Sequence, residues 1–76
     1  MTKGEFRAAL DVLEMSQTEF ARMIGIEART SRRYALGETP VPGAVSVLLR
    51  LLLARPELKD VLEDVIAGES RERANA

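Results

Sequence analysis

The apolar residues recur along the chain at the spacing of amphipathic helices, with charged residues between them. The first stripe consists of Phe6, Ala9, Leu10 and Leu13. It predicts a helix over residues 3–13. A similar stripe near the C-terminus consists of Leu58, Val61, Leu62, Val65 and Ile66. It predicts a last helix that begins at Pro56 and ends at Gly68, and the polar residues 69–76 are expected to form a flexible tail.

Capping and glycine signals predict two short helices in the middle of the chain. Ser16 and Glu19 form the S-x-x-E pattern of a capping box, in which each side chain accepts a hydrogen bond from the other residue's backbone N–H. The pattern predicts a helix over about residues 17–23. Gly25 stands where a chain leaving a helix adopts a positive φ. A second short helix is expected over residues 28–36.

Glycine and proline delimit a fourth helix. Gly37 ends the helix before it, and after a loop Pro42 suits the first helical position, where its missing N–H would be unpaired anyway. The helix extends to about Ala54, because Pro56 disfavours helical geometry at Arg55. The chain is therefore predicted to be all-α, with five helices and no strand.

The helix over residues 42–54 carries more apolar side chains than one face can hold. They are Val45, Val47, Leu48, Leu49, Leu51, Leu52 and Leu53. A helix that is apolar all round must be covered on all sides. Either the first and last helices cover it within one monomer, or its spare face and the last helix form a two-fold dimer. We expect the dimer, because so small a domain has little core of its own and the chain has no Cys or His for a disulfide or a zinc site.

The composition argues against an enzyme. With 76 residues and neither Cys nor His, one small domain has no thiolate, imidazole or usual zinc ligand set, and we expect no metal and no cofactor. Glu63 and Asp64 fit a solvated helix face better than a catalytic pair. The apolar block over residues 51–54 is far shorter than the ~20 residues of a membrane span. With no signal peptide and no Cys, the expected compartment is the cytoplasm.

Charge is unevenly distributed, although the net charge is only −1. Residues 16–37 carry four positive and two negative charges, whereas residues 56–76 carry three positive and six negative ones. Three of the central positive charges are Arg29, Arg32 and Arg33. A planar guanidinium can bind guanine O6 and N7 together or hold a phosphate. The helix over residues 28–36 is therefore a candidate nucleic-acid contact.

Residues 15–52 resemble the helix-turn-helix core of the phage repressor and Cro-like, or Xre-type, DNA-binding proteins. The matching positions are Ser16–Gln17 at a helix start, Phe20–Ala21 on its buried face, Gly25 and Ile26 in the turn, Arg33–Tyr34 on the next helix, and Gly37 behind it. The resemblance implies a five-helix, repressor-like DNA-binding domain over residues 1–68. In such a domain the helix over residues 28–36 enters the major groove of DNA.

The resemblance also implies which residues contact DNA. They are Gln17, Ala28, Arg29, Thr30, Arg32 and Arg33. Gln17 takes the position that touches phosphate, and the spacing of 28, 29, 32 and 33 independently puts them on one helix face. Thr30 and Ser31 add possible hydroxyl contacts, while Ile26, Ser31 and Tyr34 point toward the core. Alternatively, Arg29, Arg32 and Arg33 form a solvated basic face that pairs with Glu27, and Gln17 is an exposed residue at a helix start without a DNA contact. Arg22 is expected to contact either a phosphate or solvent.

Four residues depart from the family pattern. Glu27 stands where Ser or Thr usually caps the helix; its carboxylate repels a nearby phosphate, so it either accepts from cytosine N4 or restrains Arg29. Ser31 replaces a usually apolar residue, and Ala35 a commonly polar one. Ala28 offers only a methyl contact to thymine.

These features lead to two functional hypotheses. The first is a sequence-specific transcriptional regulator, a repressor that binds a palindromic operator in double-stranded DNA as a homodimer. Residues 37–58 are similar to the end of the Xre domains in many antitoxins of toxin–antitoxin systems. The alternative is therefore an antitoxin or adaptor whose main role is binding a protein partner such as a toxin.

Overall fold

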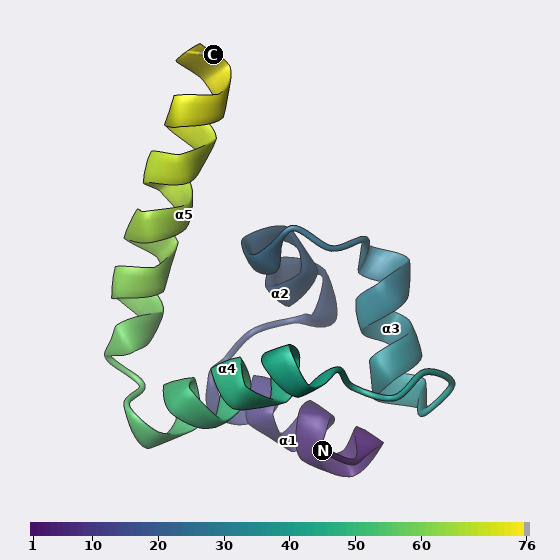
Figure 1. The fold of residues 1–76 in the computed structure, drawn as a ribbon. Coiled ribbons are helices and arrows are strands. Elements are labelled where there is room, and N and C mark those ends of the chain that lie inside the picture. The colour runs from purple at the N-terminus through teal and green to yellow at the C-terminus, as the bar shows by residue number, and fades with distance from the viewer. Residues whose placement is uncertain (76) are drawn as a thin grey trace.

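The computed structural model describes the backbone of residues 1–75 and the side chains of residues 1–68. This part of the chain forms five helices and no strand, so the all-α prediction is confirmed. The helices are α1 (Lys3–Val12), α2 (Gln17–Ile24), α3 (Ala28–Leu36), α4 (Gly43–Ala54) and α5 (Leu58–Asn75). Helix α1 packs against α3 and α4, and α2 packs against α3 and α5 (Figure 1). None of these helices is long and apolar enough to cross a bilayer.

Capping boxes fix the starts of the first two helices. The Glu19 N–H donates to Ser16 Oγ (3.0 Å) and the Ser16 N–H donates to Glu19 Oε1 (3.2 Å), which confirms the prediction at this position. Thr2 and Glu5 form a second box, with bonds of 3.1 and 2.9 Å, that the sequence analysis missed. Each box satisfies two backbone N–H groups that would otherwise lack a partner at a helix start.

Two glycines turn the chain between α2, α3 and the following loop. Gly25 has φ 78° and Gly37 has φ 75°, both in the left-handed region that L-residues with side chains avoid. The N–H groups of Gly25 and Ile26 both donate to the Ala21 carbonyl at 3.0 Å. Helix α2 therefore closes at Gly25, and α3 begins three residues later at Ala28, as predicted.

The core centres on Phe6 of α1. Its ring makes edge-on contacts with Phe20 of α2 and Tyr34 of α3, with a centroid distance of 5.7 Å in each case. Leu49 and Leu52 bring α4 into the same cluster. One aromatic side chain thus joins three helices, and the orientation of α3 relative to α2 is set by this contact as well as by the turn.

The boundaries of α5 differ from the prediction at both ends. The helix begins at Leu58 after a turn at residues 56–57, rather than at Pro56. Gly68 does not end it, because a glycine in a helix interior costs only about 1 kcal/mol relative to alanine and the helix extends to Asn75. The backbone of residues 69–75 is helical. The side chains of the predicted tail, and all of residue 76, lie outside the described residues.

Helix α5 is attached to the rest of the domain along one side. Leu58, Leu62 and Ile66, spaced by four residues, pack against the core. The Lys59 ammonium donates to the Leu13 carbonyl at the end of α1, at 3.1 Å. This bond spans 46 residues of sequence and gives a free helix-end carbonyl a cationic partner.

Candidate nucleic-acid interface

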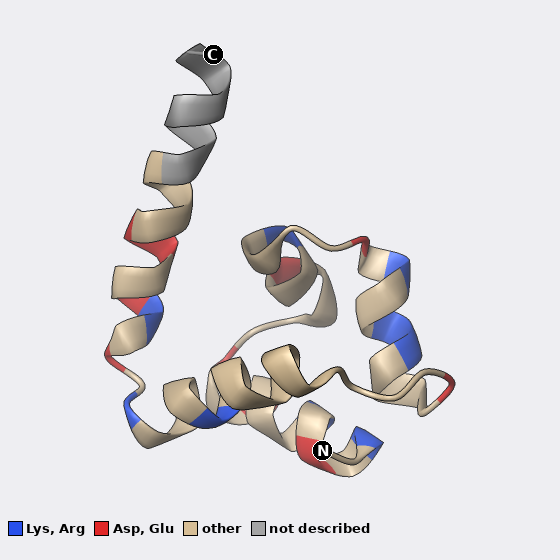
Figure 2. Cartoon of the chain, viewed as in Figure 1, with Lys and Arg blue, Asp and Glu red and all other residues tan. Residues whose placement is uncertain are grey.

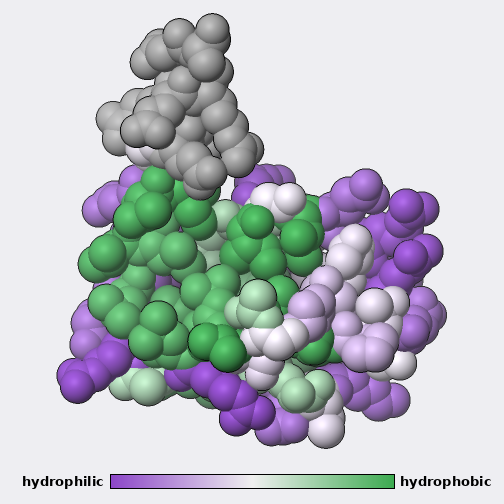
Figure 3. Space-filling view, viewed as in Figure 1, coloured by the Kyte–Doolittle hydropathy of each residue, from purple (hydrophilic) through white to green (hydrophobic). Residues whose placement is uncertain are grey.

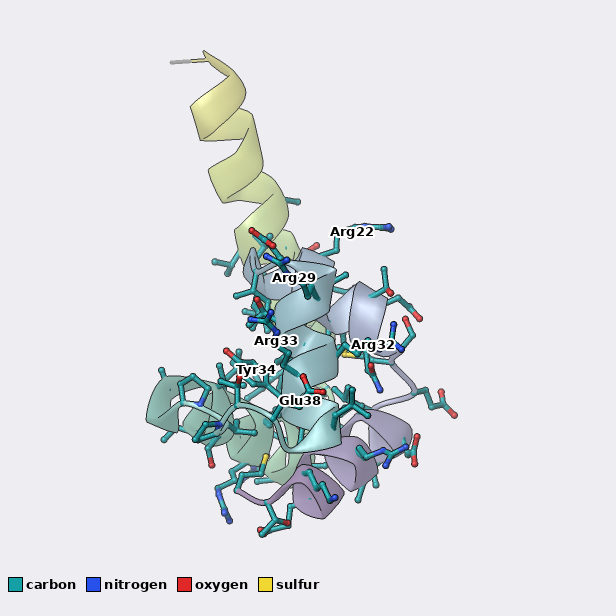
Figure 4. All side chains as sticks on the ribbon, turned by 90° about the vertical axis from the view of Figure 1, so that its right-hand side faces the viewer. Arg22, Arg29, Arg32, Arg33, Tyr34 and Glu38 are labelled. Atoms are coloured by element: carbon teal, nitrogen blue, oxygen red, sulfur yellow. The ribbon has the colours of Figure 1, made fainter. Side chains whose placement is uncertain are left out.

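Helix α3 presents its arginines to solvent. Arg29, Arg32 and Arg33 are all exposed, and they spread over the side of α3 that faces the viewer in Figure 4. Among the residues whose side chains are described, no acidic group pairs with Arg32 or Arg33. The guanidinium groups of Arg32 and Arg33 therefore keep all their donors available. The alternative, a basic face paired with Glu27, is found among the described side chains only at Arg29.

The opposite side of α3 belongs to the core. Tyr34 and Ser31 are buried and Ile26 is half-buried, which confirms the predicted inward face. Ser31 is 0% exposed, so the suggestion that its hydroxyl contacts DNA is wrong. Ala35 is also buried. Its small side chain fits a packed position, which explains why a polar residue is absent there.

The starts of α2 and α3 lie on either side of an open hollow. It is lined by Gln17, Thr18, Ala28, Arg29 and Arg32. Four of the six predicted DNA-binding residues are therefore brought together. Arg33 and the half-buried Thr30 do not line this hollow. The sequence analysis missed Thr18, and the signal that would have found it is its hydroxyl in the first turn of α2, directly after Gln17.

Glu27 precedes the basic face directly, as the red segment before the blue ones on α3 in Figure 2 shows. It is the N-cap of α3, but its side chain makes no capping hydrogen bond. Glu27 Oε2 instead lies 3.4 Å from Arg29 Nη2. Of the two roles expected for Glu27, the restraint of Arg29 is thus present in the structure.

Leu36 extends the arginine face toward the end of α3. It lies four residues after Arg32 and three after Arg33, and it is 48% exposed. The spacing of these residues could have revealed it, but its apolar character pointed to the core. An exposed leucine beside arginines can meet the methyl group of a thymine, the apolar feature of the major groove.

Arg22 lies away from the hollow. It lines a groove between α2 and α5 together with Glu19, Lys59 and Glu63. The pKa of the Glu19 carboxyl is held below its ordinary value, first by the hydrogen bond from the Ser16 backbone, with smaller contributions from Lys59 and Arg22. Glu63, predicted to lie on a solvated helix face, lines this groove together with two cations. Neither of the ion pairs found among the described side chains joins Glu63 to Arg22 or Lys59.

Comparison with protein-family models finds no match, and comparisons with curated proteins and with solved structures find no significant match either.

Proposed function

We propose that the protein is a sequence-specific, non-enzymatic DNA-binding transcriptional regulator of the Xre type. In this proposal α2, the turn at residues 25–27 and α3 form a helix-turn-helix, and α3 enters the major groove. The observation that carries it is the face of α3 beside the hollow at the start of α2, where Arg32 and Arg33 are exposed and have no ion-pair partner among the side chains of residues 1–68. As a DNA-binding protein without cysteine, it is expected to act in the cytoplasm.

The two parts of the interface suit two kinds of contact. Arg32 and Arg33 can each bind guanine O6 and N7 with one planar fork. The hollow, with the Gln17 amide, the Thr18 hydroxyl and the Arg29 guanidinium, suits a backbone phosphate, which fixes register without reading sequence. The face of α3 would then specify the operator, and the hollow would position it.

Selection from random-sequence duplexes tests this division. The wild type should enrich one motif. Arg33→Ala should cost about 1–3 kcal/mol and relax the preference at one base position, whereas Gln17→Ala should weaken binding to all sequences alike. Arg55→Ala, which removes an exposed arginine at the end of α4, is the matched control and should leave binding unchanged. A wild type that enriches no motif would refute the proposal.

The regulator is proposed to act as a homodimer. An apolar surface covers α4 and the described part of α5 in the view of Figure 3. The exposed large apolar side chains of these two helices are Val47, Leu51, Val61 and Val65, each between 50% and 67% exposed. Fully burying one such side chain contributes roughly 1.5–3 kcal/mol, and a two-fold axis would cover eight at once, four from each copy. Dimerisation would place two copies of α3 about 34 Å apart, in successive major grooves of a palindromic operator.

Sedimentation without DNA tests the dimer. Leu51→Asp and Val65→Asp should each give a monomer at tens of micromolar, where the wild type is a dimer. Leu36→Asp, which changes an exposed leucine on the arginine face instead, should leave the dimer intact. A monomeric wild type would favour the second candidate function, an antitoxin or adaptor whose apolar α4–α5 surface binds a different protein, such as a toxin.

A further inference from the structure

The carboxylate of Glu27 needs an explanation beyond the fold. Thr2 and Ser16 cap their helices with side-chain hydrogen bonds, but Glu27 does not cap α3. Its ion pair with Arg29 joins two side chains that are 73% and 71% exposed. An exposed pair of this kind contributes little to stability, because water screens it and two long side chains lose freedom. Neither capping nor packing accounts for a negative charge at the start of a basic face, and its attraction to the positive end of the α3 dipole is weak because the side chain is exposed.

The chemistry of a carboxylate is selective in the environment proposed for α3. An ionised carboxylate only accepts hydrogen bonds. Phosphate oxygens and the O6 and N7 atoms of guanine are acceptors too, so they repel Glu27. The donors on base edges in the major groove are cytosine N4 and adenine N6, and a glutamate pairs best with cytosine N4. Glu27 therefore has one favourable kind of partner in DNA and many unfavourable ones.

The ion pair with Arg29 makes this selection conditional. Arg29 lines the hollow proposed to hold a phosphate, yet its Nη2 atom is directed to Glu27 at 3.4 Å. While the pair is closed, the carboxylate cancels part of the positive charge that Arg29 would offer a phosphate. A phosphate that draws Arg29 away leaves the carboxylate without a donor. A cytosine at the facing base pair supplies a replacement donor, and other bases on that strand supply a poorer one or none. Replacing Arg29 by a base as the hydrogen-bond donor to Glu27 is thus favourable only on DNA with a cytosine at that base pair.

We propose that Glu27 is a specificity-determining residue, which weakens binding to DNA of arbitrary sequence and favours a cytosine opposite the start of α3. This proposal rests on the proposed function. The arginine face is proposed to favour DNA binding, whereas Glu27 acts mainly against DNA of other sequences. It keeps Arg29 from the phosphates of DNA that has no cytosine opposite the start of α3.

The test compares Glu27→Gln with Glu57→Gln, which removes the same charge from an exposed residue before α5. Each variant is titrated with a mixed-sequence duplex and with the motif that the wild type selects. Glu27→Gln should bind the mixed-sequence duplex about three- to tenfold more tightly, because one repulsive charge is gone. It should also lose the preference at one base pair of each half-site. Glu57→Gln should match the wild type in both assays.

Three outcomes overturn the proposal in distinguishable ways. If Glu27→Gln selects the wild-type motif with an unchanged ratio of specific to mixed-sequence affinity, the role of Glu27 is refuted while the proposed function stands. If Glu27→Gln binds every sequence more weakly and its thermal unfolding midpoint falls, Glu27 is only a structural residue of α3. If the wild type itself selects no motif, both proposals fail.

Discussion

Replacing Ser31 by alanine should make the protein more stable. The Ser31 side chain is completely buried on the inner side of α3, and its Oγ atom has no hydrogen-bond partner within the described part of the chain. A buried hydroxyl that loses its water without gaining a partner carries an uncompensated desolvation cost. Ser31→Ala removes this polar atom and keeps the rest of the side chain.

Three contributions set the size of the effect. Leaving a buried polar group unsatisfied costs about 1–3 kcal/mol. Alanine also has a higher helix propensity than serine, by about 0.5 kcal/mol. These two gains are partly offset by the void that the removed oxygen atom leaves, which lowers the free energy of unfolding by an amount on the order of 0.5 kcal/mol. The net gain in the free energy of unfolding is about 1–3 kcal/mol. For a domain of this size each kcal/mol raises the unfolding midpoint by roughly 4–8 °C.

Thermal unfolding followed by circular dichroism at fixed protein concentration measures this gain. Ser46→Ala is the matched control, because Ser46 Oγ does accept a hydrogen bond, from Arg50 Nε at 3.2 Å. Its propensity gain and its lost bond should nearly cancel, leaving a change within about 0.5 kcal/mol. A Ser31→Ala midpoint equal to or below that of the wild type would mean that the hydroxyl is satisfied, and the reasoning would be wrong.

Further predictions concern the helix ends. Gly25→Ala should destabilise the protein by about 1 kcal/mol in urea unfolding, because the φ of 78° is unfavourable for alanine; no steric clash adds to this cost, since no atom lies near the new Cβ. Gly68→Ala should stabilise the protein by a similar amount, because Gly68 lies in a helix interior and its new Cβ also meets no atom. Ser16→Ala should cost about 1 kcal/mol through the lost cap. Hydrogen bonds from Ser16 and Thr2 lower the pKa values of Glu19 and Glu5, respectively. The stability that these two ionised carboxylates contribute is therefore present above their ordinary pKa of 4.5 and is lost as the pH falls through their folded-state pKa values. That pH dependence should shrink in Ser16→Ala.

Local signals explain why most helices could be predicted from the sequence. The Ser16–Glu19 box and Gly25 act within a few residues, and both behave in the structure as the pattern indicated. The end of α5 could not be predicted in this way. Gly68 weakens a helix without stopping it, and no proline follows it in residues 69–76.

The candidate site was only partly visible because it depends on how the helices pack. The common face of Arg29, Arg32 and Arg33 follows from helical spacing alone. The hollow that adds Thr18 depends on the approach of α2 to α3, which the contact of Phe6 with Phe20 and Tyr34 helps to fix. Such long-range contacts leave no periodic trace in the sequence.

The arginine face lies on α3 and the exposed apolar side chains lie on α4 and α5, so the proposed DNA binding and dimerisation would use different helices. In the proposed complex one copy of α3 would make few base contacts, each worth about 1–3 kcal/mol, so a single subunit would hold its half-site weakly. The proposed dimer through α4 and α5 would make the second contact intramolecular and raise affinity without a new base contact. Occupancy of the operator would then rise steeply with protein concentration around the dimerisation range. Leu51→Asp should therefore abolish this steepness and weaken operator binding while leaving the half-site preference unchanged, because Leu51 lies on α4, away from the arginine face.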